Sequence, residues 1–285
     1  MDRLTVQSPA KLNLVLDVLR KRPDGFHELR TIFERISLCD QITLTRNKTR
    51  KISIRCAHPH VPLSSKNLAV KAAMLLSKDF SITEGLDINI IKNIPVAAGL
   101  GGGSSNAAAV LMGLNRLWQI GLSNAHLVRY AERLGSDVAF FLYDTSYALG
   151  EGRGEIIKPL GVTTKLWHLL VTPRVKMYTP EVFARLKLSL TNKKDNVNIL
   201  LPFLRKGDIM RLAGALSNDL EPAILSLRPD FIYLKKKLID AGAAGVCFSG
   251  SGPSVMALAT SQKHALSLRA KFDRRYSQVF VVSTL

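Results

Sequence analysis

The 285-residue sequence has only three cysteines, Cys39, Cys56 and Cys247. They are odd in number, widely spaced and form no C-x-x-C pair, so neither a disulfide framework nor a zinc site is indicated. We expect each of them to be a small apolar side chain that is buried or half-buried.

Long hydrophobic runs are also missing, although 47% of the residues are hydrophobic. No uninterrupted apolar stretch approaches the length of a membrane span. The N-terminus lacks the apolar region of a signal peptide and leads directly into a predicted strand. We therefore expect a cytoplasmic globular protein that has no membrane partner.

Aromatic residues are scarce at 7%, whereas the formal net charge is +18. The basic residues are scattered in short clusters and do not alternate with aromatic residues, as a base-stacking surface would require. Solvated basic faces that attract small anionic substrates explain this charge. Nucleic-acid binding is therefore the less favoured interpretation.

The most informative segment is glycine-rich: Ile94 to Ala109 reads I-P-V-A-A-G-L-G-G-G-S-S-N-A-A-A. Apolar residues then recur at helical spacing from Ala107 to Trp118. A glycine loop that leads into a helix N-terminus gathers backbone N–H groups, which favours phosphate binding. No lysine follows the glycines as in a Walker A motif, and the Rossmann pattern fits poorly. The alternative is a glycine turn that joins a strand to a core helix.

The order of predicted elements indicates an α+β fold. Strands are expected at 12–18, 31–37, 41–45, 52–55 and 87–91, and helices at 68–78 and 124–134, the latter with Ser123 as N-cap. Thr179 is expected to cap another helix, with Pro180 at its first position. Helices are expected at 197–204, 208–216, 229–241 and 261–274, and strands at 167–171, 245–248, 255–258 and 278–283. A domain boundary is predicted after residue 158, which separates domains 1–158 and 159–285.

Three separated motifs complete the pattern. The first is Pro9-Ala10-Lys11-Leu12-Asn13-Leu14, extended by Asp24-Gly25-Phe26-His27-Glu28-Leu29; the second is the glycine loop; the third is the turn Phe248 to Ser254. In this order they resemble the galactokinase, homoserine kinase, mevalonate kinase and phosphomevalonate kinase (GHMP) superfamily. The first motif is most similar to that of the 4-diphosphocytidyl-2-C-methylerythritol kinases.

This resemblance implies a two-domain fold, with an N-terminal domain like ribosomal protein S5 domain 2 and a ferredoxin-like C-terminal domain. It also implies ATP-dependent phosphorylation of the 2-hydroxyl of a diphosphocytidyl methylerythritol in non-mevalonate isoprenoid synthesis. The alternatives are another GHMP kinase, of homoserine or mevalonate type, or a basic RNA-binding protein with an S5-like domain.

Lys11 and Asp137 match the catalytic residues of that family. Asp137 would accept the proton of the attacking hydroxyl, and the Lys11 ammonium would keep it ionised and offset charge on the transferred group. Asn13 shares a strand face with Lys11 and would orient the acceptor. Without the resemblance, Asp137 would be read as a turn carboxylate and Lys11 as a solvated lysine.

Phe26 and His27 match the cytidine-binding pair, an aromatic face for stacking and an imidazole for the polar edge of the base. Phe183 matches the second aromatic residue that the family stacks against the base, although a core phenylalanine would look the same in the sequence. Phe26 departs from the tyrosine that is common there, which removes a possible hydrogen bond. Ala139 and Asn106 depart from the commoner proline and aspartate.

The resemblance assigns the ATP phosphates to the backbone of the glycine loop, with a Mg²⁺ ion near Ser104 or Ser105. Gly250, Ser251 and Gly252 of the third motif would lie on the substrate side. The predicted ATP-binding residues are Pro95, Ala97, Ala98, Gly99, Leu100, Gly101, Gly102, Gly103, Ser104 and Ser105.

Overall fold

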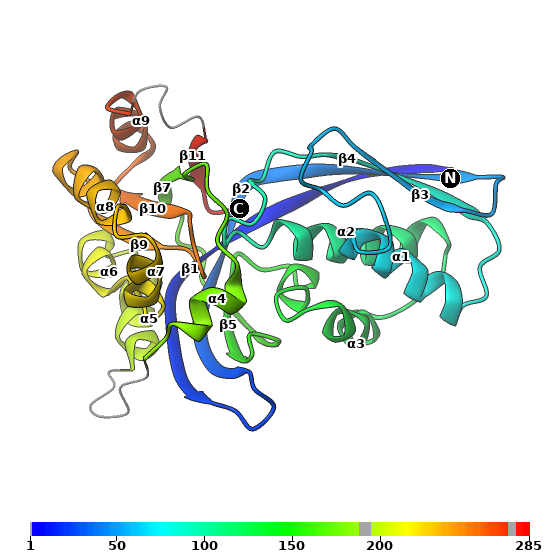
Figure 1. The fold of residues 1–285 in the computed structure, drawn as a ribbon, viewed down its shortest axis with the longest axis horizontal. Helices are drawn as coiled ribbons and strands as arrows, with labels where there is room; N and C mark the ends of the chain where they lie inside the picture. The colour runs from blue at the N-terminus through cyan, green and yellow to red at the C-terminus, as the bar shows by residue number, and fades with distance from the viewer. Residues whose placement is uncertain (1, 188–194, 273–277) are drawn as a thin grey trace. The chain divides into compact units, whose positions relative to one another are not determined.

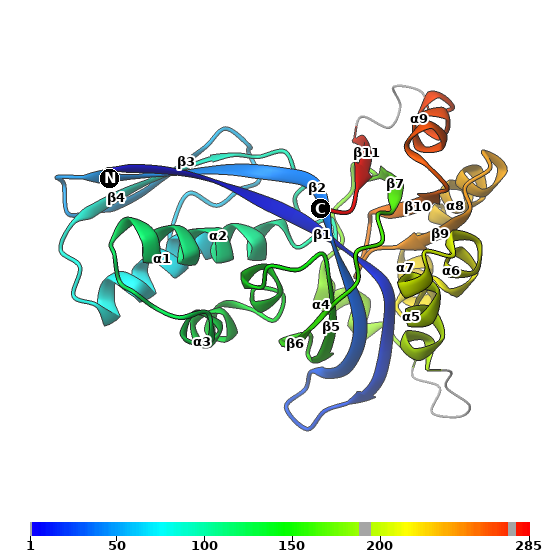
Figure 2. The same ribbon diagram turned by 180° about the vertical axis from the view of Figure 1, so that it is seen from behind.

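The computed structural model describes residues 2–187, 195–272 and 278–285. These residues form two compact units (Figures 1 and 2). Unit 1 comprises Met1–Ala10, Leu38–Val96 and Gly101–Asp144, and unit 2 comprises Lys11–Ser37, Ala97–Leu100 and Thr145–Leu285. The two long strands β1 (Arg3–Lys21) and β2 (His27–Asn47) contribute residues to both units.

Unit 1 is a sheet covered by helices on one face. In its sheet, β4 (Gly85–Ile91) pairs antiparallel with the end of β2 and parallel with β3 (Ile52–Cys56). Its helices are α1 (Leu68–Asp79), α2 (Gly102–Leu117), α3 (Asn124–Leu134) and the short 3-10 helix η1 (Ala139–Leu142). All lie on one side of the sheet in Figures 1 and 2.

Apolar and polar residues alternate along these strands, and this alternation explains which face of the sheet the helices cover. Ile42, Leu44, Leu86 and Ile88 are buried completely, whereas the residues between them carry polar side chains. On α2, the apolar residues that the sequence places at helical spacing are all buried. The predicted core face of this helix is therefore confirmed.

Unit 2 contains a four-stranded antiparallel sheet in the order β11-β7-β10-β9. Its strands are β7 (Trp167–Val171), β9 (Gly245–Phe248), β10 (Val255–Ala259) and β11 (Val279–Ser283). The helices of the unit are α4 (Thr179–Ala184), α5 (Asn196–Lys206), α6 (Ile209–Ala215), α7 (Glu221–Leu227), α8 (Phe231–Asp240) and α9 (Gln262–Ala270). One apolar core joins this sheet to α7, α8 and α9.

The remaining strands of unit 2 pair with β1 and β2. The antiparallel pair β5 (Tyr147–Gly152) and β6 (Ile156–Leu160) extends from β2, and the two-residue β8 (Ser217–Asn218) pairs with β1. These pairings bring the start of the chain beside its second half. The Lys11–Val18 part of β1 consequently lies within unit 2.

Most predicted elements are confirmed, and α3 has the predicted Ser123 N-cap and Gly135 just after its end. Three predictions are wrong. The strands expected at 31–37 and 41–45 are one continuous β2, and α7 lies where no helix was predicted. Thr179 does not cap α4: Tyr178 holds that position, and the Thr179 hydroxyl bonds to Ser251 instead. The helix predicted at 261–274 ends earlier, at Ala270. Positions 273 and 274 of that prediction fall outside the described residues, as does the first residue of the chain.

The three cysteines are buried or half-buried, as expected for small apolar side chains. Cys39 and Cys56 are half-buried, Cys247 is buried, and none of the three forms a disulfide within the described residues. Burial raises the pKa of the Cys247 thiol to about 12. Among the described residues, none of the helices combines the length and the apolar character that a membrane crossing requires. The domain boundary after residue 158 stays a prediction, because the compact units follow spatial contacts rather than one cut in the sequence.

Candidate functional site

The predicted site residues divide between the two units. Pro95, the segment 101–105 and Asp137 belong to unit 1. Unit 2 holds the other predicted residues: Lys11, Asn13, Phe26, His27, Ala97, Ala98, Gly99, Leu100, Phe183, Gly250, Ser251 and Gly252.

Lys11 and Asn13 form a buried polar pair on one face of β1. The Lys11 Nζ donates to Asn13 Oδ1 at 2.7 Å, and the two residues are only 5% and 2% exposed. Asn13 Nδ2 donates in turn to the Thr31 hydroxyl at 2.8 Å. The ammonium also lies 5.2 Å from the centre of the Phe33 ring, within cation–π range. The alternative of a solvated lysine is wrong, because Lys11 is buried among these partners.

The third motif contacts the glycine loop and lies beside Lys11. The Ser249 hydroxyl donates to the Gly99 carbonyl at 3.0 Å, and the Lys11 amide donates to the Leu100 carbonyl at 3.0 Å. A Cβ at Gly99 would lie 2.1 Å from the Ser249 carbonyl oxygen, so only glycine fits there. A Cβ at Gly250 would lie 3.4 Å from Asn13 Oδ1 and 3.5 Å from Lys11 Nζ. We call Lys11, Asn13, Gly99 and Gly250 the transfer cluster.

Asn218 supports this cluster from β8, and sequence analysis gave it no role. Its side-chain amide donates to the carbonyls of Phe248 and Gly250 at 3.0 and 2.8 Å. Its Oδ1 accepts from the Leu220 amide at 2.9 Å. Ser251, next to Gly250, is tied to Thr179 by a hydroxyl–hydroxyl hydrogen bond of 2.8 Å. The Gly250–Ser251 turn is thus fixed on both sides.

Phe26, His27 and Phe183 form a second group, which we call the aromatic group. The His27 and Phe183 rings stack with centroids 4.9 Å apart and planes at 29°. Phe26 is 54% exposed, and the Arg153 guanidinium lies 4.9 Å from its ring centre. Desolvation of His27, and secondarily the charge of Lys21, lower the pKa of the imidazole below its ordinary 6.5. The ring is consequently neutral at neutral pH, and a neutral imidazole offers both a donor and an acceptor for hydrogen bonds to the edge of a base.

In unit 1, helix α2 begins inside the glycine stretch. Gly101 is its N-cap at a φ of +68°, and a Cβ on Gly102 would lie 3.0 Å from Ile94 and 3.1 Å from Lys92 Nζ. The N–H groups of the first turn have no partner within the helix, and the helix dipole adds positive potential there. This end of α2 has the backbone needed to bind phosphate.

The two serines of the loop differ in their surroundings. Ser105 is 1% exposed, and its hydroxyl accepts a 2.7 Å hydrogen bond from Ser8, which also lies 3.4 Å from Asn106 Oδ1. Ser104 is half-buried in the first turn of α2. Of the two serines predicted as magnesium ligands, Ser104 is therefore the less buried residue.

A buried ion pair precedes the loop, and the sequence gave no signal for it. Asp40 is fully buried and accepts from the Lys92 ammonium at 2.7 Å. Its other oxygen accepts from the Asn93 and Ile94 amides at 2.8 Å each. Burial lowers the pKa of Lys92, which Asp40 partly opposes. The pair fixes the backbone that leads into Pro95.

Asp137 lies between the end of α3 and the start of η1. The residue is half-buried, whereas Val138, Ala139 and Phe140 immediately after it are fully buried. Burial of these three apolar residues fixes the segment, so that the carboxylate sits on an anchored turn. Ala139, the departure from the commoner proline, is part of this buried segment.

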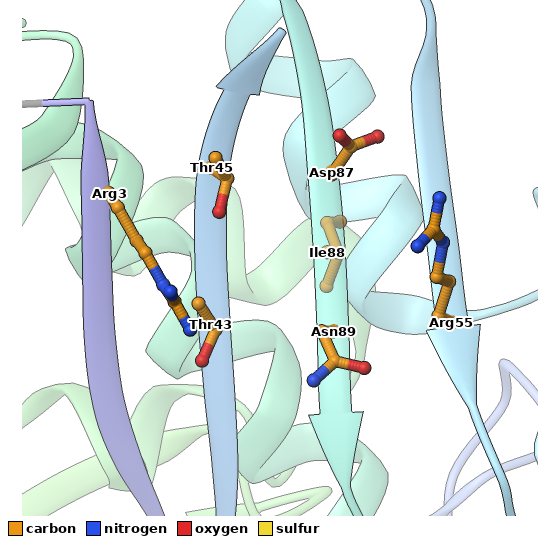
Figure 3. Close-up of a pocket in the computed structure, with 7 residues that line it drawn as sticks. All are labelled: Arg3, Thr43, Thr45, Arg55, Asp87, Ile88 and Asn89. Atoms are coloured by element: carbon orange, nitrogen blue, oxygen red, sulfur yellow. The ribbon is translucent and has the colours of Figure 1, made fainter.

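A further hollow of about 340 Å³ lies on the polar face of the unit 1 sheet (Figure 3). It is lined by Arg3, Thr43, Thr45, Arg55, Asp87, Ile88 and Asn89. None of these is a predicted site residue. Within the described part of the chain, no three histidine, cysteine or acidic side chains are grouped so that they could hold a metal ion.

Comparison with known proteins identifies the family. Residues 67–145 match the GHMP kinases N terminal domain and residues 200–278 match the GHMP kinases C terminal domain. Relatives named 4-diphosphocytidyl-2-C-methyl-D-erythritol kinase include one from Brevibacillus brevis, 38% identical over 99% of this chain and 97% of that protein. One from Geobacter metallireducens is 42% identical over 93% and 92% of the two chains.

Solved structures of the same family have the same fold as this chain. A crystal structure of 4-(cytidine 5'-diphospho)-2C-methyl-D-erythritol kinase is 30% identical, with a TM-score of 0.84 over 98% of each chain. Homoserine kinase from Cytophaga hutchinsonii, at 22% identity and a TM-score of 0.80 over 100% and 95% of the chains, shares the fold. The chain therefore belongs to the GHMP kinases and, within them, to the 4-diphosphocytidyl-2-C-methyl-D-erythritol kinase family.

Proposed function

We propose that this protein transfers the γ-phosphoryl group of ATP to the 2-hydroxyl of 4-diphosphocytidyl-2-C-methyl-D-erythritol, a step of isoprenoid precursor synthesis. One observation carries the proposal for this chain: the transfer cluster brings residues of all three sequence motifs together beside the buried Lys11. The relatives over nearly the full length carry the name of this kinase.

Phosphoryl transfer to an alcohol requires alignment and charge neutralisation more than covalent help from the protein. Lys11 supplies a fixed positive charge, because its Nζ is held by Asn13 and lies over the Phe33 ring. Such a charge stabilises the developing negative charge without reorganisation during the reaction. Asn13, held by Thr31, orients the acceptor hydroxyl.

Asp137 is the proposed general base. Its carboxylate accepts the proton of the attacking hydroxyl as the new phosphate–oxygen bond forms and the bond to ADP breaks. The anchored turn before η1 supports this role, since a base must be held at a fixed position.

The aromatic group is the proposed cytidine site. The exposed Phe26 ring offers a stacking face, and the neutral His27 imidazole offers one donor and one acceptor to the base edge. Phe183, whose ring stacks on His27, is the proposed second aromatic residue of this site.

Residues 99–105 are the proposed cradle of the ATP phosphates, through backbone N–H groups of the loop and of the first turn of α2. Mg²⁺ fits this site, because it prefers phosphate and water oxygens and needs few protein ligands. The Ser104 hydroxyl would hold it, and bound Mg²⁺ would neutralise charge on the β- and γ-phosphates.

The test is ADP production from Mg-ATP with 4-diphosphocytidyl-2-C-methyl-D-erythritol, homoserine and mevalonate offered separately. Turnover with the cytidyl compound alone is expected. Turnover with a small acceptor would keep the fold and the phosphate loop but remove the proposed roles of Phe26 and His27. No turnover with any acceptor, from folded protein that binds ATP, would contradict the proposal.

Asp137→Asn tests the general base. Turnover is expected to fall at least about a hundredfold, the scale of a lost proton acceptor. ATP affinity, measured by calorimetry, should stay close to that of the unchanged protein. Equal activity in the variant would remove Asp137 from the mechanism.

A further inference from the structure

Arg153 covers one face of the Phe26 ring. Its guanidinium carbon lies 4.9 Å from the ring centre, within the range in which a cation is attracted by an aromatic face. The ring is nevertheless 54% exposed, so much of its surface stays accessible to a second planar group. Phe26 has no hydroxyl that could anchor it by a hydrogen bond, so its orientation depends on such contacts.

The turn between β5 and β6 holds Arg153 in place. The Arg153 amide donates to Glu155 Oε2 at 2.5 Å, and the Arg153 Nε lies 3.5 Å from Glu155 Oε1. The neighbouring Gly152 and Gly154 have φ angles of +71° and +102°, which favour glycine. The sequence Gly152-Arg153-Gly154-Glu155 thus builds a turn that presents the guanidinium.

The backbone of Phe26 is fixed from the opposite side. The Phe26 amide donates to Asp24 Oδ1 at 3.1 Å, and its carbonyl accepts from the Arg22 amide at 2.8 Å. Desolvation acts against ionisation of Asp24, but the Phe26 amide and the guanidinium groups of Arg22 and Arg153 together lower the pKa of the carboxyl. Arg153 therefore acts on both the ring and the turn that carries it.

We propose that Arg153 is a positioning residue that holds the Phe26 ring so that its uncovered surface receives the cytosine base. The inference rests on the proposed function, because it assumes that Phe26 stacks on that base. Arg153 acts through Phe26 and does not itself contact the substrate.

A double-mutant cycle with cytidine 5'-diphosphate as the probe tests whether Arg153 acts through Phe26. Arg153→Met keeps an unbranched apolar side chain and removes the charge, and it should weaken binding of the probe about two- to fivefold, the scale of an exposed cation–π contact. Arg153→Lys should recover part of this loss, since an ammonium also binds an aromatic face. In a Phe26→Ala background, Arg153→Met should have no further effect.

Steady-state kinetics should show an effect on binding of the cytidyl substrate and none on the transfer step. The KM for the cytidyl substrate should rise in Arg153→Met, whereas kcat and the KM for ATP stay unchanged. Arg211→Met is the matched control, because Arg211 lies 6.0 Å from the centre of the Phe203 ring and neither residue is a predicted site residue. This control should leave every binding and kinetic constant as it is.

Unchanged affinity in Arg153→Met would overturn the inference. The same loss in the Phe26→Ala background would also overturn it, since Arg153 would then act without Phe26. Failure of the proposed function is recognised separately: protein that binds the cytidine probe and yet transfers no phosphoryl group would refute the kinase proposal and still report on Arg153.

Discussion

The transfer cluster and the aromatic group differ in how firmly the protein holds them. Lys11 and Asn13 are 5% and 2% exposed, and hydrogen bonds to Thr31 and to the neighbouring backbone hold them. Phe26 is 54% exposed and is held mainly through its backbone and through Arg153. The same unit thus contains one rigid and one open part of the proposed site.

This difference matches the proposed tasks of the two parts. Stabilising a transition state requires charges that are already in place, because reorganising them during the reaction costs free energy. Recognising a base requires an accessible face that the ligand can reach. Changes in the transfer cluster should therefore lower kcat, and changes in the aromatic group should raise KM for the cytidyl substrate.

The largest effect is expected from Lys11→Met. Loss of the fixed positive charge should lower kcat about a hundred- to a thousandfold, as for other removed electrostatic stabilisers. Steady-state kinetics with both substrates measure it. Lys158→Met, which changes a lysine that is 60% exposed on β6, should leave kcat unchanged. If Lys11→Met raised the KM for the cytidyl substrate and left kcat unchanged, the division of tasks between the transfer cluster and the aromatic group would be contradicted.

Gly99→Ala tests whether the transfer cluster tolerates displacement. A methyl group would lie 2.1 Å from the Ser249 carbonyl, so the loop must move away from the third motif. We expect kcat to fall at least about tenfold, because small displacements of aligned groups are costly. Gly121→Ala is the control: Gly121 has a similar φ of +80° and nothing within 4 Å of its added Cβ. Both variants share the backbone strain, so only the crowding differs.

Phe26→Ala should act on binding instead. Loss of the stacking face should raise the KM for the cytidyl substrate about tenfold, within the range for base–aromatic stacking, while kcat stays within twofold. Phe80→Ala removes another exposed phenylalanine, 37% exposed against 54% for Phe26, at the end of α1 and should change neither constant. A fall in kcat alone would show that Phe26 belongs with the transfer cluster.

The smallest effect should be a pH dependence of base recognition. Since the pKa of His27 is lowered below 6.5, its neutral form persists from pH 8 to below pH 6.5. Protonation at lower pH removes the acceptor, so the dissociation constant of cytidine 5'-diphosphate should be flat above pH 7 and rise as the pH falls through the pKa. His27→Asn should abolish this rise. A rise of equal size in the variant would assign the titration to another group.

The same pKa shift has a consequence for stability. The folded state binds the His27 proton less readily than the unfolded chain does, so the neutral ring contributes stability that is fully present above pH 6.5. That contribution is lost as the pH falls from 6.5 through the lowered pKa. Urea unfolding at pH 7.5 and pH 5.5 should show a smaller decrease for His27→Asn than for the unchanged protein.

Local signals predicted much of the fold. Ser123 and Gly135 mark both ends of α3, and the apolar period of α2 identifies its buried face. The break expected inside β2 does not occur: residues 29–34 pair with β5, residues 41–47 pair with β4, and the strand continues between these two pairings. Helix α7 was missed, since this short segment gains stability from the core of unit 2 rather than from a cap.

The site was predictable in part. Motif recognition identified the residues of the transfer cluster and of the aromatic group, and their proposed roles stay predictions. It gave no role to Asn218, and it did not find Arg153 or the Asp40–Lys92 pair, because each of them acts through contacts with residues distant in sequence. It also could not separate Ser104 from Ser105, which differ only in what surrounds them.

The sequence by itself determined the periodicity of the strands and helices, the glycines required at positive φ, and the residue types needed for phosphate, ammonium and base recognition. Only the tertiary structure decided that Gly99 lies against Ser249, that Lys11 is buried beside Asn13, and that Arg153 covers Phe26. The physical reason is range. Backbone preferences and side-chain period act over a few residues, whereas hydrogen bonding joins residues 150 positions apart, as from Ser249 to Gly99, or 250 positions apart, as from Thr284 to Glu34.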